Sequence, residues 1–203
     1  MTKLTKALLV IFLILIADQI LKIYVKTSMP LGATNPVIGK WFLLRFIENP
    51  GMAFGIDIPG KWGKPALTLF RIVAAFFIGW YLRNLIVKKA PTGFIICLAM
   101  IFAGAVGNII DSVFYGVIFS SSNYFEAATM FPEGGGYASL LNGKVVDMLY
   151  FPLIEGNYPD WFPFLGGQKF IFFRPIFNIA DSSISVGVAA ILIFQRKYLK
   201  EIS

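Results

Sequence analysis

Four aspartates stand in or beside strongly apolar stretches of this sequence, where ionisable side chains are rare. They are Asp18, Asp111, Asp147 and Asp181. A charged aspartate at the centre of a membrane helix costs about 2.5–3.5 kcal/mol, so it usually has a partner or a function. Two adjacent carboxyl groups cannot both ionise cheaply, so one of them retains a proton. Such a pair offers general acid–base chemistry, in which one carboxylate activates water and the other carboxyl group donates a proton.

Two of these aspartates also have simple structural explanations. Asp18 and Lys22 are four residues apart, which suits an ion pair on one helix face. Asn108 and Asp111 are three apart on another predicted helix, and they could form a hydrogen-bond network between helices. The functional alternative is that both pairs support a polar site at the helix ends.

The other two aspartates, Asp147 and Asp181, also have structural explanations. Asp147 lies beside a strand-like run, where a lone aspartate is often a turn residue or a cap. Asn178 and Asp181 are three apart at the start of an apolar stretch. Asparagine is a good helix N-cap and aspartate suits the positive end of the helix dipole, so capping is the structural alternative here.

Several kinds of catalytic site are excluded by what the sequence lacks. It has no histidine, which rules out a Ser-His-Asp triad, a Cys-His pair and a histidine-ligated metal. Its single cysteine, Cys97, cannot form an intrachain disulfide or a cysteine-rich metal site. We expect neither a metal nor another cofactor.

Composition indicates a membrane protein. Of 203 residues, 57% are hydrophobic and only 14% are charged, against about 25% charged in a typical soluble domain. Four apolar stretches approach the roughly 20 residues that cross a bilayer as a helix. They lie at about 7–25, 66–87, 93–117 and 177–195. We expect an α-helical integral membrane protein, a single membrane domain over residues 1–203 with four transmembrane helices.

Positive charge predicts how these helices are oriented. The segments 1–6, 82–92 and 196–203 hold eight Lys and Arg residues in 25 positions. Cytoplasmic segments carry such an excess, so both termini are expected in the cytoplasm. The two long loops, about 26–65 and 118–176, are then extracytoplasmic. The net charge of +7 is thus a topology signal, and we expect no nucleic-acid partner.

The loops contain further structural signals. Loop 30–64 has strand-like apolar pieces at 41–47 and 52–54, split by Asn49-Pro50-Gly51, and predicts a small extracytoplasmic β-sheet. Loop 118–176 is rich in Gly, Pro and aromatic residues, which suits an interfacial loop or helix region. The topology brings the outer ends of the helices to one level, so we expect the polar residues to cluster near the outer leaflet.

Five short motifs resemble those of the lipoprotein signal peptidase (signal peptidase II) family, in the same order and over nearly the whole chain. They are Asp18-Gln19-Ile20-Leu21-Lys22, Asn49-Pro50-Gly51-Met52-Ala53-Phe54-Gly55, Gly107-Asn108-Ile109-Ile110-Asp111, Gly143-Lys144-Val145-Val146-Asp147 and Phe177-Asn178-Ile179-Ala180-Asp181. The resemblance implies an intramembrane aspartic endopeptidase of the bacterial inner membrane. Such an enzyme cuts the signal peptide from prolipoproteins just before a diacylglyceryl-modified cysteine.

The resemblance also implies residue roles and partners. Asp147 and Asp181 correspond to the catalytic dyad. The substrate-binding and supporting positions are Asp18, Lys22, Asn49, Gly51, Asn108, Asp111, Asn178 and Ala180. Implied partners are diacylglyceryl-modified prolipoproteins, membrane lipid and globomycin-type inhibitors. We expect a monomer.

The sequence departs from the family pattern in two places. Ser112 stands where the family usually has an arginine that reaches toward the substrate, and Lys144, Lys169 and Arg174 are candidates to supply that contact. Residues of about 118–142 form an insertion of unknown role.

Three other functions compete with this interpretation. A small proton-coupled transporter would also use intramembrane aspartates, but it often shows internal repeats, which we do not find. A non-enzymatic membrane scaffold would use the aspartates for stability alone. A Ser-Lys protease would use Lys22, but no feature selects its serine.

Overall fold

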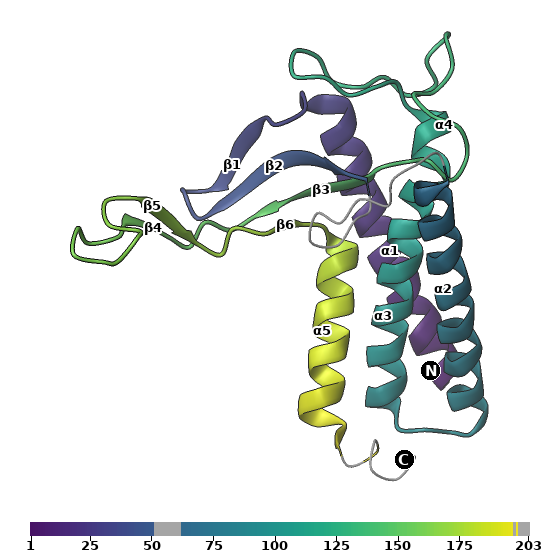
Figure 1. Cartoon of the computed structure of the whole chain (residues 1–203). Coiled ribbons are helices and arrows are strands. Elements are labelled where there is room, and N and C mark those ends of the chain that lie inside the picture. Colours follow the sequence, from purple (N-terminus) through teal and green to yellow (C-terminus); the bar gives the residue numbers. More distant parts are fainter. Residues whose placement is uncertain (51–61, 197, 199–203) are drawn as a thin grey trace.

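The computed structural model describes residues 1–50, 62–196 and 198, and its main helices follow the four apolar stretches of the sequence (Figure 1). These helices are α1 (Lys3–Ser28), α2 (Gly63–Val87), α3 (Thr92–Ile110) and α5 (Ile179–Phe194). Helix α3 continues through a π-helical segment, η1 (Asp111–Tyr115), into the short helix α4 (Gly116–Ile118).

Three of these helical segments are long and apolar enough to cross a membrane. They are Lys3–Ser28, Gly63–Val87 and Thr92–Ile118. Helix α5 is equally apolar but has 16 residues, which span about 24 Å at 1.5 Å per residue. Large side chains such as Phe12, Phe70 and Phe194 are exposed, as expected of surfaces that face lipid. The fold is therefore that of a helical membrane protein.

Helix α3 is the central helix and packs against α1, α2 and α5. Its contact with α5 depends on glycines, because a Cβ atom at Gly104 would lie 2.3 Å from the carbonyl oxygen of Ala180. On α5, a Cβ at Gly187 would lie 2.8 Å from the carbonyl oxygen of Cys97. Small residues let membrane helices approach closely, and here they fix the start of α5 against α3.

A four-stranded antiparallel sheet lies across the end of the helices that is remote from the N-terminus (Figure 1). Its order is β1 (Thr34–Ile38), β2 (Phe42–Asn49), β3 (Val145–Tyr150) and β6 (Ile176–Phe177). The predicted small sheet is confirmed, and it combines strands from both long loops. Strand β6 leads directly into α5, so its pairing with β3 brings the start of α5 beside β3.

The region between α4 and α5 is built from strands and loops. Strands β4 (Ile154–Asn157) and β5 (Lys169–Phe172) form a separate hairpin that projects beyond the sheet (Figure 1). All of residues 119–178 are described, and none of them is helical. The expected interfacial region is therefore a loop and hairpin region without a helix.

Two apolar clusters stabilise this arrangement. One joins α1, α2 and α3 and includes Ala7 of α1. The other joins α1 to the sheet and includes Val25 of α1, Phe46 and Met148. Along α1, the segment from Asp18 to Lys22 lies between the parts that enter these clusters. Asp18 and Lys22 therefore occupy a polar layer with apolar packing on both sides.

Candidate active site

Asp147 and Asp181 come from two different kinds of element that the sheet brings together. Asp147 lies within β3 and is 5% exposed. Asp181 lies in the first turn of α5, after the N-cap residue Asn178. Because Leu149 of β3 pairs with Phe177 of β6, the chain enters α5 next to Asp147. The sheet register, rather than closeness in sequence, thus places the two carboxyl groups at one site.

Asn178 connects the two aspartates directly. Its amide Nδ2 donates a hydrogen bond of 2.8 Å to Oδ1 of Asp147. Its side-chain oxygen accepts a hydrogen bond of 2.8 Å from the backbone N–H of Asp181. Asn178 is fully buried, so its side chain is held in one orientation. It therefore caps α5 and bridges the dyad at the same time.

Two further asparagines each donate to one aspartate of the pair. Asn49, at the end of β2, donates from Nδ2 to Oδ2 of Asp147 at 3.3 Å. Asn108, on α3, donates from Nδ2 to Oδ1 of Asp181 at 2.8 Å. Each carboxyl group thus has a side-chain amide that fixes its orientation, as an acid–base pair requires.

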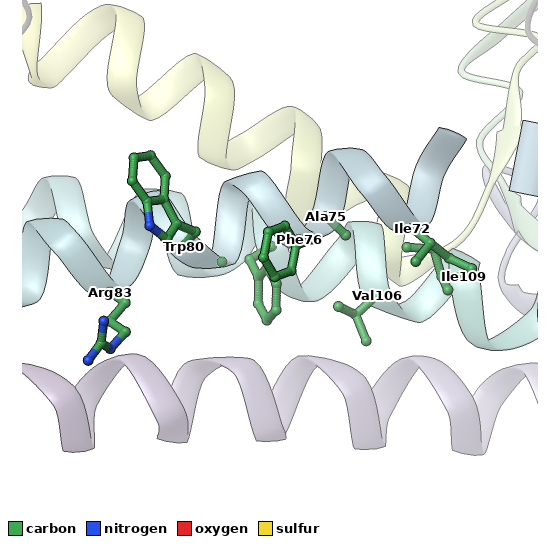
Figure 2. A pocket seen from close by; sticks show the side chains of 9 residues that line it. Ile72, Ala75, Phe76, Trp80, Arg83, Val106 and Ile109 are labelled. Atoms are coloured by element: carbon green, nitrogen blue, oxygen red, sulfur yellow. The ribbon is translucent and has the colours of Figure 1, made fainter. Parts of the chain in front are cut away.

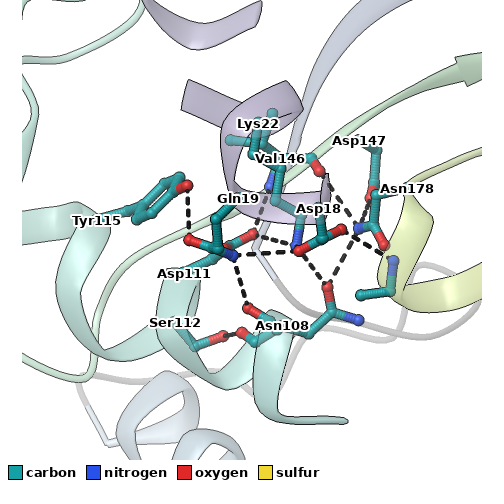
Figure 3. A network of polar contacts seen from close by, with 12 residues as sticks. Asp18, Gln19, Lys22, Asn108, Asp111, Ser112, Tyr115, Val146, Asp147 and Asn178 are labelled. Carbon is teal, nitrogen blue, oxygen red and sulfur yellow. Dashed lines mark hydrogen bonds and ion pairs between the residues drawn. The ribbon is translucent and has the colours of Figure 1, made fainter. Parts of the chain in front are cut away.

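A buried ion cluster lies next to the dyad (Figure 3). The Nζ atom of Lys22 is 2.8 Å from a carboxylate oxygen of Asp18 and 2.8 Å from one of Asp111. It also donates to Oδ1 of Asn108 at 3.0 Å. Asp18, Lys22 and Asp111 are 1% exposed or less. A buried charge is tolerated only when it is paired and hydrogen-bonded, and Lys22 meets this condition.

The two carboxylates of this cluster hold the backbone beside the dyad. Oδ2 of Asp111 accepts a hydrogen bond of 3.2 Å from the N–H of Val146, which precedes Asp147. Oδ1 of Asp18 accepts one of 2.9 Å from the N–H of Ala180, which precedes Asp181. Each supporting aspartate therefore positions one member of the dyad through the preceding residue.

The close packing around Gly107 and Gly143 explains why their motifs contain glycine. A Cβ atom at Gly107 would lie 2.9 Å from Oδ2 of Asp18 and 3.1 Å from the Cβ of Ala180. A Cβ at Gly143 would lie 2.0 Å from the carbonyl oxygen of Asp111. Any side chain at these positions would separate the elements that carry the site.

Burial and charge make Asp147 a weak acid at this site. Burial, and then the like charge of Asp181, raise the pKa of Asp147 to about 7. The hydrogen bonds from Asn49 and Asn178, and the charge of Lys22, oppose this rise. Asp147 can therefore hold or release a proton near neutral pH, which suits a general acid or base.

An open pocket of about 360 Å³ lies beside Asp147. Its lining includes Asn49, Pro50, Asp147, Arg174 and Ile176. Asp147 is thus reachable from outside the protein, although most of its surface is buried. A polypeptide and a water molecule could both approach the carboxyl group from this side.

The structure brings nearly all of the predicted site residues into one network. The described members are Asp18, Lys22, Asn49, Asn108, Asp111, Asp147, Asn178, Ala180 and Asp181. Gly51 lies outside the described residues. Sequence analysis did not select Gln19 and Tyr115, although Gln19 donates to Oδ1 of Asp111 at 3.0 Å. The hydroxyl of Tyr115 in turn donates to Oε1 of Gln19 at 3.1 Å.

Arg71 of α2 is the cation nearest to Ser112 among the described contacts. Its Nη1 atom lies 3.4 Å from Oγ of Ser112, and it interacts electrostatically with Asp147 and Asp181. The sequence offered Lys144, Lys169 and Arg174 for this place. Lys144 instead pairs with Glu48, whereas Arg174 lines the pocket beside Asp147. Arg71 belongs to no motif, and the signal that could have found it is its charge inside an apolar stretch.

Comparisons with known proteins agree with the motifs. Residues 10–196 match the family model described as signal peptidase (SPase) II. The chain is 53% identical over 184 residues to the lipoprotein signal peptidase of Porphyromonas gingivalis, covering 90% of this chain and 79% of that protein. It is 36% identical over 192 residues to the lipoprotein signal peptidase of Amoebophilus asiaticus, covering 93% and 77%.

The fold is also similar to that of solved proteins. A structure described as a bacterial membrane enzyme superposes with a TM-score of 0.60 at 26% sequence identity. The similarity covers 97% of this chain and 89% of that one. The likeness therefore extends over the helices and the sheet together.

Proposed function

We propose that this chain, which belongs to the signal peptidase II family, cuts its substrate by an aspartic mechanism in which Asp147 and Asp181 share one proton. The chain is a bacterial membrane protease that removes signal peptides from prolipoproteins. The observation that carries the mechanism is the position of Asn178, which binds the carboxylate of Asp147 and the backbone N–H of Asp181 and so keeps the two residues side by side. The near-neutral pKa of Asp147 supports it.

The dyad divides the work of hydrolysis between its two carboxyl groups. The ionised carboxylate takes a proton from water while the water oxygen attacks the scissile carbonyl carbon. The protonated carboxyl group gives its proton to the carbonyl oxygen, which forms a neutral gem-diol. When the diol collapses, the C–N bond breaks, the leaving nitrogen takes the proton that came from water, and a diol hydroxyl returns its proton to the other carboxylate as the C=O bond forms again. One shared proton is enough for the complete cycle.

We assign the peptide part of the substrate to the pocket beside Asp147. Asn49 lines this pocket and already donates to Asp147, so it is placed to hydrogen-bond an extended peptide as well. Arg71 of α2 lies against Ser112 and interacts electrostatically with both aspartates, so it supplies a positive charge for substrate carbonyl groups, as Arg174 does from the lining of the pocket. It would then perform the task that the family gives to an arginine at the position of Ser112.

The acyl chains of a diacylglyceryl-modified cysteine need an apolar path that begins near the dyad. A groove of about 510 Å³ between α2 and α3 offers one (Figure 2). It begins at Ile72 and Ile109, which follow Arg71 and Asn108 in sequence, and continues to Trp80 and Arg83. Its lining is almost entirely apolar, so membrane lipid and substrate acyl chains both fit it.

The same proposal includes the orientation in the bilayer. Helix α5 is the fourth crossing, both termini are cytoplasmic, and the dyad lies near the outer leaflet of the inner membrane. The Lys and Arg excess in residues 1–6, 82–92 and 196–203 supports this orientation. A site near the outer surface can receive both water and a substrate that arrives through lipid.

The site also has consequences for inhibition and assembly. Globomycin-type cyclic peptides would occupy the peptide pocket beside Asp147 and block cleavage. The active form would be the monomer.

The proposal is tested by cleavage of a diacylglyceryl-modified prolipoprotein by purified protein in detergent. Asp147→Asn and Asp181→Asn should each lower kcat by about 10²- to 10⁴-fold, the usual contribution of acid–base groups. Asp160→Asn, an exposed aspartate of the projecting hairpin, is the matched control and should cleave like the wild type. Wild-type turnover by either dyad variant would refute the proposed mechanism.

A further inference from the structure

A second buried charge cluster lies behind the catalytic strands, centred on Glu48 of β2. The carboxylate of Glu48 forms an ion pair with Lys26 of α1, and both side chains are 3% exposed or less. It also pairs with Lys144 at 2.9 Å and accepts a hydrogen bond of 2.7 Å from Oγ of Ser122. Lys26 and Lys144 keep the pKa of Glu48 below its usual range, although burial alone would raise it. Glu48 is therefore a fully paired anion.

The insertion noted in the sequence encloses this cluster. The Nζ atom of Lys26 lies 5.4 Å from the ring centre of Phe119 and 5.0 Å from that of Tyr137. The hydroxyl of Tyr137 accepts a hydrogen bond of 2.7 Å from the N–H of Lys144. The N–H of Ala128 donates to the carbonyl oxygen of Lys26 at 3.1 Å. Residues 119–144 thus wrap around Lys26 and exclude water from its ion pair.

The cluster is connected to both strands that carry active-site groups. Glu48 directly precedes Asn49, which donates to Asp147. Lys144 directly precedes β3, three residues before Asp147. In the sheet, Glu48 pairs with Val146 and Asn49 pairs with Val145. Neighbouring residues of a strand point to opposite faces, so Glu48 anchors the face of β2 opposite to the one that carries Asn49.

We propose that Glu48 is a positioning residue, and that Lys26 and the 119–144 segment around it hold Asn49 and β3 in the geometry that aims Asp147 at the substrate. This inference rests on the aspartic mechanism proposed above. An ion pair removed from water is strong only when all of its polar atoms are satisfied, and the segment supplies the missing partners through Ser122 and Tyr137. The insertion therefore serves catalysis without touching the substrate.

Misplacement of Asn49 should change the proton affinity of Asp147 as well as the rate. The hydrogen bond from Asn49 favours the ionised form of Asp147 and lowers its pKa. The charged groups that act on Asp147 are Asp181 from α5, Lys22 from α1 and Arg71 from α2. Loss of the negative charge of Glu48 would by itself leave Lys26 and Lys144 unpaired and lower the pKa of Asp147. A pH profile that moves to higher pH in a Glu48 variant would therefore report on Asn49.

The test compares Glu48→Gln and Ser122→Ala with the wild type in the same cleavage assay. Glu48→Gln should lower kcat by about 10- to 100-fold, as expected when a catalytic group is misplaced, with a smaller change in KM. The fall of kcat at alkaline pH should move to higher pH. Ser122→Ala removes a single hydroxyl group and should lower kcat by about three- to tenfold.

Glu133→Gln is the matched control, because Glu133 is an exposed carboxylate of the same insertion; it should behave like the wild type. Thermal unfolding in detergent shows whether Glu48→Gln is folded, and Ser122→Ala decides the question if it is not. Wild-type kcat and an unchanged pH profile in folded variants would overturn the inference. Asp147→Asn is measured alongside: if it stays active, the aspartic mechanism itself has failed, whereas an inactive Asp147→Asn with normal Glu48 and Ser122 variants refutes only this inference.

Discussion

At the scale of single residues, Asn178 has two roles that a suitable substitution can separate. Its side-chain oxygen caps α5, and its amide nitrogen binds Asp147. Serine is also a good N-cap, but it lacks the amide donor. A serine at this position would therefore keep the helix start and lose the bridge between the two aspartates.

Asn178→Ser should accordingly keep the cap of α5 and lose activity. We expect kcat to fall by about 10- to 100-fold because Asp147 loses its orientation. The midpoint of thermal unfolding in detergent should fall as well, because Nδ2 of Asn178 also donates to Asn108 and to the carbonyl oxygen of Val146, and a buried group left without its partner costs about 1–3 kcal/mol. Asn157→Ala, an exposed asparagine of β4, should change neither quantity. Wild-type kcat in Asn178→Ser would show that the bridge is not needed for catalysis.

The sequence predicted residues of the site well where a motif marked them. The pairs Asp18 and Lys22, and Asn178 and Asp181, lie at helical spacing, and the structure uses both pairs as expected. Asn178 caps α5 and donates to Asp147 at the same time. Asp111 has a role beyond the predicted hydrogen-bond network between helices, because it also accepts a hydrogen bond from the N–H of Val146.

The partners of Arg71 and Glu48 could not be predicted from the sequence, and the reason is physical. Each is a single charged residue whose partners are distant in sequence. Arg71 meets Ser112 only when α2 packs beside α3. Glu48 meets Lys26 and Lys144 only when the sheet closes over α1. Local spacing cannot reveal contacts that tertiary packing creates.

At the scale of elements, the contact between α3 and α5 decides where Asp181 stands. Gly104 and Gly107 allow the start of α5 to pack directly against α3. Asn108, one residue further along α3, then reaches Asp181. Gly104 and Gly107 therefore influence the position of Asp181 by setting the distance between α3 and α5.

Gly104→Ala should separate these helices, because the new Cβ atom would meet the backbone oxygen of Ala180. Overpacking of this kind costs about 1–3 kcal/mol, so we expect a lower unfolding midpoint in detergent and a reduced kcat. Gly93→Ala is the matched control on the same helix. Its Cβ would meet only the end of the flexible Gln195 side chain, which can move away. Equal behaviour of the two variants would argue against close packing at Gly104.

The strands show which elements sequence patterns could and could not predict. A small sheet was expected from residues 30–64, and β1 and β2 form there. The joining of β3 to β2 depends on pairing over about a hundred residues, and the joining of β6 to β3 on pairing over nearly thirty; no local pattern encodes either. The hairpin of β4 and β5 was not predicted, because its aromatic-rich sequence suggested only an interfacial region.

At the scale of the whole molecule, the sheet and the helices share the site between them. Helices α1, α3 and α5 supply the ion cluster and Asp181, while the sheet supplies Asp147 and Asn49. The sheet lies at one end of the helices (Figure 1), so Asp147 and Asp181 lie where the apolar helices meet the sheet. This arrangement accounts for a hydrolase whose substrate is anchored in lipid.

The dependence of kcat/KM on pH tests the shared proton of the dyad most directly. The native pKa of Asp147, about 7, is above that of an unfolded aspartate, about 3.9. The protonated native form is therefore favoured between these values and is lost as the pH rises through about 7. Once both carboxyl groups are ionised, no proton remains for the substrate carbonyl.

We therefore predict that kcat/KM for the cleavage of a diacylglyceryl-modified prolipoprotein, measured in detergent between pH 5 and pH 9, falls as the pH rises above about 7, because kcat/KM follows the ionisation of the free enzyme. The slope should approach tenfold per pH unit, as for the loss of a single proton. The enzyme should remain folded over this range, which thermal unfolding at each pH can verify. A kcat/KM that instead rises steadily up to pH 9, as for a serine activated by a neutral lysine, would contradict the aspartic mechanism.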